Sequence, residues 1–135
     1  MTERQDLLFV YGTLRAGGGR PLARWFPGRV VRLGPGRVAG ALLDLGGYPG
    51  LVEDVPGTVR GEVYRLLAPR QILAALDAYE GCAPHSPHPH EYERVRRAVT
   101  LDDGRRVTAW VYLYRGPRRG RRRIPSGDWL ARRKG

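Results

Sequence analysis

The chain has very few of the residue types that commonly act as nucleophiles or metal ligands. Among 135 residues it contains a single cysteine, Cys82, which excludes an intramolecular disulfide framework, a CxxC redox pair and a cysteine-based zinc cluster. Its only lysine, Lys134, follows no phosphate-binding glycine loop and lies too near the end for Schiff-base chemistry. Neither of its two serines, Ser86 and Ser126, stands in a G-x-S-x-G elbow.

Long apolar runs are also missing. No stretch approaches the length of a membrane span, and residues 1–6 are polar and carry two acids, unlike a signal peptide. The remaining composition, 41% hydrophobic and 27% charged, is that of one globular domain. We therefore expect a cytoplasmic protein, whose 19 glycines and 11 prolines favour short strands and turns over a helical bundle.

The net charge of +11 is concentrated near the C-terminus. Residues 115–135 contain eight arginines and Lys134 against one acid, Asp128, whereas the rest of the chain is only mildly basic. We accordingly divide the chain into a folded body at residues 1–115 and an Arg-rich segment at 116–135, which we interpret as solvated. Nucleic acid would bind such a segment without sequence specificity.

Hydrophobic patterning predicts an α+β fold: a small mixed or antiparallel β-barrel of about six strands, with one main helix and short flanking helices. The helix is expected at Pro69–Glu80, between a first-position proline and a terminating glycine. A single helical turn at Pro21–Phe26 and a closing helix at Ser126–Arg133 complete the helical set. The strands are expected at Leu7–Tyr11, Arg29–Leu33, Val38–Leu45, Thr58–Leu66, Tyr92–Leu101 and Arg105–Tyr114, with Gly34-Pro35-Gly36 as a turn and Ala83–His90 as an irregular loop.

One acidic residue falls within the apolar face of the predicted helix. On a helical wheel Ile72, Leu73, Leu76 and Tyr79 form that face, and Glu80 lies inside the same arc. Burial and the negative end of the helix dipole both raise the pKa of a carboxyl group there, toward the neutral range of a general acid or base. The alternative is a frayed last turn in which Glu80 reaches solvent or an arginine.

A second candidate is the turn Tyr11-Gly12-Thr13-Leu14, which follows the first predicted strand. Successive backbone N–H groups in such a turn bind a carboxylate, and Gly12 allows a ligand to approach the backbone closely. The alternative is a turn that only ends the strand. We also expect Tyr112 and Tyr114 to line a pocket, with help from Tyr92, unless these aromatics only pack on central strands.

Six short motifs follow one another between about residue 7 and residue 114. They are Phe9-Val10-Tyr11-Gly12-Thr13-Leu14-Arg15, Tyr48-Pro49-Gly50-Leu51-Val52, Gly61-Glu62-Val63-Tyr64, Leu76-Asp77-x-x-Glu80-Gly81, Tyr92-x-Arg94 and Ala109-Trp110-Val111-Tyr112. Each is short, but in this order the six resemble the landmarks of the gamma-glutamylcyclotransferase-like family. Thr13 makes the first motif look more like the gamma-glutamylamine branch than the glutathione-type branch.

This resemblance implies both a fold and a reaction. It implies a small β-barrel in which the Tyr11–Leu14 loop binds a γ-glutamyl group and Glu80 is the acid/base. The α-amine of a γ-glutamyl amide would attack its own γ-carbonyl, releasing 5-oxoproline and an amine or amino acid. Because the substrate carries the nucleophile, no metal or cofactor is implied.

Two other functions remain open from the sequence. The same pocket could hold a small acid without turning it over, or the chain could be a basic protein associated with nucleic acid. The irregular spacing of His85, His88 and His90 among prolines predicts no metal site. The leaving group and the oligomeric state also stay open, although the many arginines favour an acidic leaving group.

Overall fold

Eight strands and two helices form within residues 6–132, the part of the chain that the computed structural model describes. Residues 1–5, most of the polar N-terminus, and residues 133–135, which include the end of the predicted closing helix, lie outside the described residues. The elements in chain order are β1 (Leu7–Val10), α1 (Leu22–Trp25), β2 (Val30–Ala39), β3 (Ala41–Asp44), β4 (Pro49–Val52), β5 (Thr58–Leu66), α2 (Pro69–Tyr79), β6 (Tyr92–Leu101), β7 (Arg106–Tyr114) and β8 (Arg122–Ile124).

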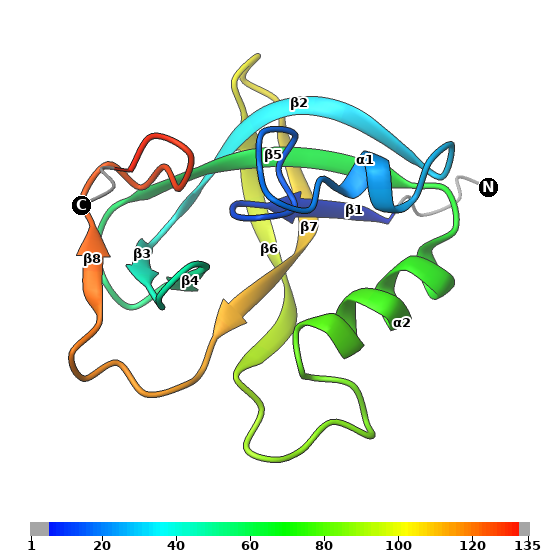
Figure 1. The fold of residues 1–135 in the computed structure, drawn as a ribbon. Coiled ribbons are helices and arrows are strands. Elements are labelled where there is room, and N and C mark those ends of the chain that lie inside the picture. Colours follow the sequence, from blue (N-terminus) through cyan, green and yellow to red (C-terminus); the bar gives the residue numbers. More distant parts are fainter. Residues whose placement is uncertain (1–5, 133–135) are drawn as a thin grey trace.

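Five of the strands close into a barrel (Figure 1). They run in the order β1, β5, β2, β6, β7, and β7 returns to β1 through a parallel pairing of Leu8 with Trp110. β4 joins β7 in parallel, and β3 and β8 extend the sheet beyond it. The predicted small mixed barrel in an α+β fold is thus confirmed, with two more strands than the six expected.

β1 is the strand that positions the first predicted site. It pairs with β5 on one side and with β7 on the other, so its backbone groups are held on both edges. Both of its faces are buried: Phe9 packs in one hydrophobic cluster and Leu8 and Val10 in a second. A strand covered on both faces requires a continuous apolar run, which explains the sequence at its start.

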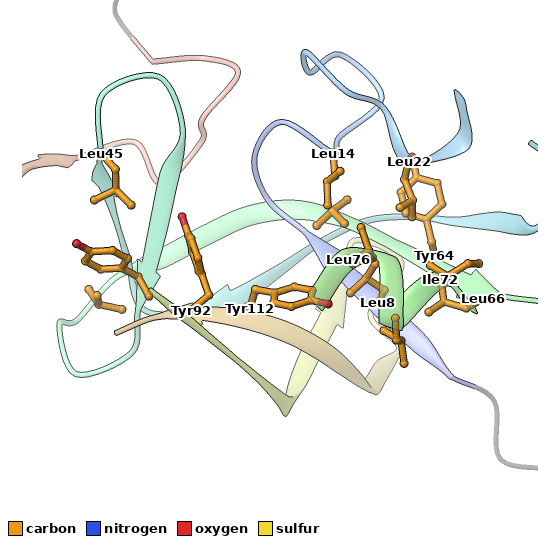
Figure 2. Close-up of a cluster of buried hydrophobic side chains, with 14 of the residues drawn as sticks. Leu8, Leu14, Leu22, Leu45, Tyr64, Leu66, Ile72, Leu76, Tyr92 and Tyr112 are labelled. Carbon is orange, nitrogen blue, oxygen red and sulfur yellow. The ribbon is translucent and has the colours of Figure 1, made fainter. Parts of the chain in front are cut away.

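Helix α2 packs on the outside of the barrel through Ile72, Leu73 and Leu76, all buried. These side chains share a hydrophobic cluster with Leu8 and Tyr64 from the strands, as Figure 2 shows. Pro69 begins the helix as predicted, and Glu80 is its C-terminal cap. Tyr79 departs from the wheel prediction of a buried residue. It is 44% exposed at the end of the helix, where one part of its ring contacts Trp25.

Two predicted strand boundaries in the first half of the chain are wrong. The Gly34-Pro35-Gly36 segment is not a turn, because β2 continues through it and all three residues pair with β5. A bulge between Arg32 and Gly34 absorbs the irregularity in register. The true break comes at Gly40, whose φ of 140° suits glycine and separates β2 from β3 within the predicted strand Val38–Leu45.

The C-terminal segment packs on the barrel between residues 122 and 129. β8 pairs with β3, and Ile124 and Trp129 are buried, so the interpretation of a solvated segment is wrong for this stretch. Residues 126–132 form turns in place of the predicted closing helix. Gly127 prevents the helix, since it has a φ of 67° and its backbone lies against the Thr58 carbonyl.

Candidate active site

The Tyr11–Leu14 loop leaves the barrel at the end of β1 and presents unpaired backbone donors. Its carbonyl oxygens are used: Arg20 N donates to Thr13 O at 2.9 Å, and Leu22 N donates to Leu14 O at 3.0 Å. The N–H groups of Gly12, Thr13 and Leu14, by contrast, donate to no acceptor within residues 6–132. Successive backbone N–H groups without an acceptor in this part of the chain are the type of donors that bind anions, as predicted for this turn.

Gly12 is required by a close approach between this loop and β4. A Cβ atom at position 12 would lie 2.6 Å from Cγ of Pro49, far inside van der Waals contact. Only glycine therefore allows the loop and Pro49 to form adjoining walls of one pocket. The glycine in the first motif has a packing reason as well as the predicted role in ligand approach.

Glu80 faces the same pocket from the end of α2. As C-terminal cap it has φ −84° and ψ −3°, and its N–H donates to Leu76 O at 2.8 Å, so the last turn is not frayed. Its pKa is raised to about 7, chiefly by burial, then by the negative charges of Glu91 and Asp77. The side chain has no ion pair with any arginine among residues 6–132.

The pocket brings the predicted site residues other than Tyr114 together around a cavity of about 280 Å³. This volume is near the lower end of the range for small-molecule sites. Its predicted lining residues are Tyr11, Gly12, Thr13, Leu14, Glu80, Tyr92 and Tyr112. Tyr114, also expected there, is buried in the core instead, where its ring packs against Tyr92. No arginine, lysine or histidine lines this cavity among the described residues.

Tyrosine hydroxyls in the wall of the pocket are committed to the protein itself. Tyr11 donates to Tyr112 O at 2.6 Å, and Tyr92 donates to Pro49 O at 2.6 Å. Tyr112 donates to Asp77 Oδ1 at 2.7 Å, and Figure 2 shows its hydroxyl directed toward α2. Burial raises the pKa of all three tyrosines, so they stay neutral and provide ring surface and shape to the pocket.

Asp77 fixes the end of α2 that carries Glu80. Its two carboxylate oxygens accept hydrogen bonds from Arg94 Nε at 2.8 Å and Arg94 Nη2 at 3.0 Å. Arg94 lies on β6 and Tyr112 on β7, so one carboxylate ties the helix to two barrel strands. This bidentate pair holds the last turn of the helix in one orientation.

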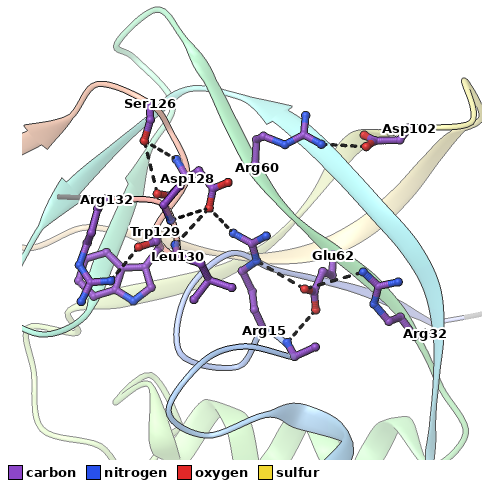
Figure 3. A network of polar contacts seen from close by, with 12 residues as sticks. Arg15, Arg32, Arg60, Glu62, Asp102, Ser126, Asp128, Trp129, Leu130 and Arg132 are labelled. Atoms are coloured by element: carbon purple, nitrogen blue, oxygen red, sulfur yellow. Dashed lines mark hydrogen bonds and ion pairs between the residues drawn. The ribbon is translucent and has the colours of Figure 1, made fainter. Parts of the chain in front are cut away.

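Sequence reasoning missed the anchor of the first loop, which is Glu62 on β5. Glu62 is only 4% exposed, and its Oε1 accepts hydrogen bonds from Ala16 N at 3.0 Å and Tyr64 OH at 3.0 Å. Arg15 lies between Glu62 and Asp128, with its Nη1 2.7 Å from Asp128 Oδ1, as Figure 3 shows. The loop is thus tied both to the barrel and to the C-terminal segment.

Six further pocket residues were not predicted as site residues: Phe9, Val10, Tyr48, Pro49, Tyr79 and Glu91. Tyr48 and Pro49 belong to the second motif, which was the available signal. Glu91 ends the irregular loop that follows Glu80, so the position of this loop beside the candidate base was the available signal.

The histidine-rich loop shows no metal site. His88 and His90 stack on each other with ring centroids 4.1 Å apart. Within residues 6–132 no three side chains of His, Cys, Asp or Glu gather closely enough to hold a metal ion.

Helices long and apolar enough to cross a membrane are absent from the described part of the chain.

Comparison with known proteins extends the sequence resemblance over nearly the whole chain. The family model "Gamma-glutamyl cyclotransferase, AIG2-like" matches residues 8–131. The gamma-glutamylcyclotransferase family protein YtfP of Escherichia coli K12 is 37% identical over 128 residues, covering 94% of this chain and 98% of the relative.

Solved structures agree with this assignment. The solution structure of ytfP from Escherichia coli superposes with a TM-score of 0.63 at 36% identity, covering 93% of this chain and 96% of that one. An AIG2-like protein from mouse has a TM-score of 0.66 at 24% identity, covering 98% and 87%, and shows the fold. The chain therefore belongs to the gamma-glutamyl cyclotransferase, AIG2-like family.

Proposed function

We propose that this protein converts a γ-glutamyl amide into 5-oxoproline and a free amine, with Glu80 as the general acid and base. The observation that carries the proposal is the pairing of two features in one cavity. Gly12, Thr13 and Leu14, whose N–H groups donate to no acceptor among residues 6–132, line the same pocket as Glu80, whose pKa is raised to about 7.

The free N–H groups suit the α-carboxylate of the γ-glutamyl group. Gly12 to Leu14 would bind this anion with backbone donors, which need no reorganisation when the ligand arrives. Binding one end of the substrate in this way places the α-amine and the γ-carbonyl near Glu80 and removes much of the orientational entropy of ring closure.

Glu80 would then move one proton twice. As a carboxylate it takes a proton from the substrate α-ammonium group, and the neutral amine attacks the γ-carbonyl carbon to form the ring C–N bond. As a carboxylic acid it gives this proton to the departing nitrogen while the original amide C–N bond breaks. The second proton of the ring nitrogen then passes, through Glu80 or solvent, to the released amine, so that the products are the neutral lactam and an ammonium ion. A pKa of about 7 suits both steps near neutral pH. The substrate supplies the nucleophile, so the proposed reaction uses no cofactor or metal.

Glu80→Gln tests the assignment. The variant keeps the size of the side chain and removes its ability to accept a proton, so 5-oxoproline release from γ-glutamyl amides should fall by at least about a hundredfold. Glu93→Gln is the matched control, because Glu93 is exposed and lies outside the pocket. It should keep wild-type turnover. Release by Glu80→Gln at the wild-type rate would refute the role of Glu80.

Two further measurements, made beside the release assay, separate the two other functions considered. A module that only binds a small acid would be stabilised against heat by γ-glutamyl compounds while releasing no 5-oxoproline. A nucleic-acid-binding protein would be retained on DNA or RNA in a salt-dependent manner and would not respond to these compounds. The enzyme is favoured because the Glu80 side chain lines the pocket and forms no ion pair with any arginine among residues 6–132.

A further inference from the structure

The pocket is acidic although the protein as a whole is strongly basic. The net charge is +11, yet the charged side chains that line the cavity are the carboxylates of Glu80 and Glu91. This is the reverse of the earlier expectation that many arginines would favour an acidic leaving group. The charge that a substrate meets is set by the pocket lining and not by the average of the chain.

The two pocket carboxylates are also set apart from the other acids. Among residues 6–132 every Asp and Glu except Asp44, Glu80 and Glu91 forms an ion pair with an arginine. Glu93 illustrates the contrast, since it lies two residues from Glu91 and pairs with Arg115 at 2.7 Å. In a chain this rich in arginine, a carboxylate left without such a partner is available to a cation from outside.

Glu91 is held in place by a neutral donor. The hydroxyl of Tyr48 donates to its Oε1 at 2.8 Å, and the Arg115 N–H donates to its backbone oxygen at 2.7 Å. The first contact orients the carboxylate without neutralising its charge, and the second fixes the backbone beside the pocket. The carboxylate is thus oriented by a neutral hydroxyl and has no arginine partner among residues 6–132.

Exposed aromatic rings complete a surface suited to a cation. Tyr48 and Tyr79 both line the pocket, with exposed fractions of 39% and 44%, and present ring surface where the cavity opens. One ring already accepts a cation: the Arg20 guanidinium lies 5.2 Å from the ring centroid of Tyr79. Aromatic faces next to an unpaired carboxylate are a common means of binding an ammonium group.

We propose that Glu91 is a specificity-determining residue that selects leaving amines with a second, positively charged group, such as the mono-γ-glutamyl amides of diamines. This inference rests on the proposed function, because it concerns the end of the substrate that leaves. With Gly12 to Leu14 and Glu80 engaging the γ-glutamyl end, the leaving group extends toward Tyr48 and Glu91. An ammonium group there is attracted by Glu91, whereas a carboxylate, as in a peptide-type leaving group, is repelled.

Three substrates of nearly equal length test this selection. They are the γ-glutamyl amides of 1,4-diaminobutane, n-pentylamine and 5-aminopentanoate, which end in an ammonium, a methyl and a carboxylate group. An ion pair in a partly solvated pocket contributes up to about 1 kcal/mol, or about fivefold. We expect wild-type kcat/KM to be about fivefold higher for the diamine amide than for the pentylamine amide, and lowest for the carboxylate.

The variants assign the preference to one residue. In Glu91→Gln the ratio between diamine and pentylamine amides should fall to within about twofold. Glu93→Gln removes the same charge on the same segment outside the cavity and should keep the wild-type ratio. A ratio that is equal in wild type and Glu91→Gln, or a wild-type preference for the carboxylate amide, would overturn the inference.

A binding measurement separates this inference from the proposed reaction. If wild type releases no 5-oxoproline from any of the three amides, the proposed function is overturned, and calorimetric dissociation constants of the same amides decide the inference alone. Tighter binding of the diamine amide that is lost in Glu91→Gln supports it. Equal binding of all three, or no binding of any, overturns it.

Discussion

Replacing Glu80 with glutamine removes a carboxylate whose ionisation is unfavourable in the folded protein. In the unfolded chain this carboxyl has the ordinary glutamate pKa of 4.5, whereas in the folded protein burial and the charges of Glu91 and Asp77 raise the pKa to about 7. The folded state therefore holds a proton that the unfolded state releases between these two values. As pH rises through this window, the wild-type protein loses stability.

The size of the loss follows from the difference between the two pKa values. A rise from 4.5 to about 7 corresponds to about 3 kcal/mol once both states are ionised, at about 1.4 kcal/mol per pKa unit. Glutamine has the same shape and cannot ionise, so Glu80→Gln avoids this cost. Relative to wild type, the variant should gain about 3 kcal/mol above pH 8 but less than about 1 kcal/mol at pH 5.

Urea denaturation of both proteins at pH 5, 6, 7 and 8.5 measures this gain. Glu93→Gln is again the control, because it replaces an exposed carboxylate that lies outside the pocket. A Glu80→Gln difference that is the same at pH 5 and pH 8.5 would refute the reasoning, since it would mean that Glu80 titrates alike in both states. The experiment is independent of any substrate.

Three further predictions concern the reaction and the scaffold. The kcat/KM for 5-oxoproline release should rise with pH to a plateau above about 7, and Asp77→Asn should move this limb to lower pH by removing one charge that raises the Glu80 pKa. Gly12→Ala should lower stability by about 1–3 kcal/mol in urea denaturation, because its Cβ would meet Pro49, whereas Gly19→Ala, with open space around it, should not. Trp129→Ala should lower stability by about 3 kcal/mol, since its ring is buried; a change near zero would contradict the packing of the C-terminal segment.

The parts of the site that could be predicted from the sequence are those with a local signal. The Tyr11–Leu14 turn follows a strand buried on both faces, and Glu80 interrupts the periodicity of the main helix. Both signals lie within a dozen residues and need no knowledge of the tertiary fold. These two signals predict one wall of the pocket and its candidate acid/base, both of which line the cavity.

The remaining features depend on contacts between distant parts of the chain. Tyr48 and Glu91 are 43 residues apart and meet only because β4 and the start of β6 flank the same cavity. Two local signals failed for the same reason. The turn predicted at Gly34-Pro35-Gly36 is part of β2, which pairs with β5, and the helix predicted from Ser126 is prevented by the close packing of Gly127 on β5. Local propensity is a weak guide where tertiary contacts hold the backbone on both sides.

The pairing of Arg15 with Asp128 joins residues 113 positions apart and has a consequence for the newly made chain. The loop after β1 is synthesised first, but its anchors on β5, β7 and the C-terminal segment emerge much later. Asp128 leaves the ribosome only close to the end of synthesis. Until then Arg15 lacks its partner, and the loop after β1 lacks its contact with the C-terminal segment. A product truncated between residues 114 and 128 would therefore contain every pocket residue. It would lack Asp128, so the loop after β1 would lose its contact with the C-terminal segment.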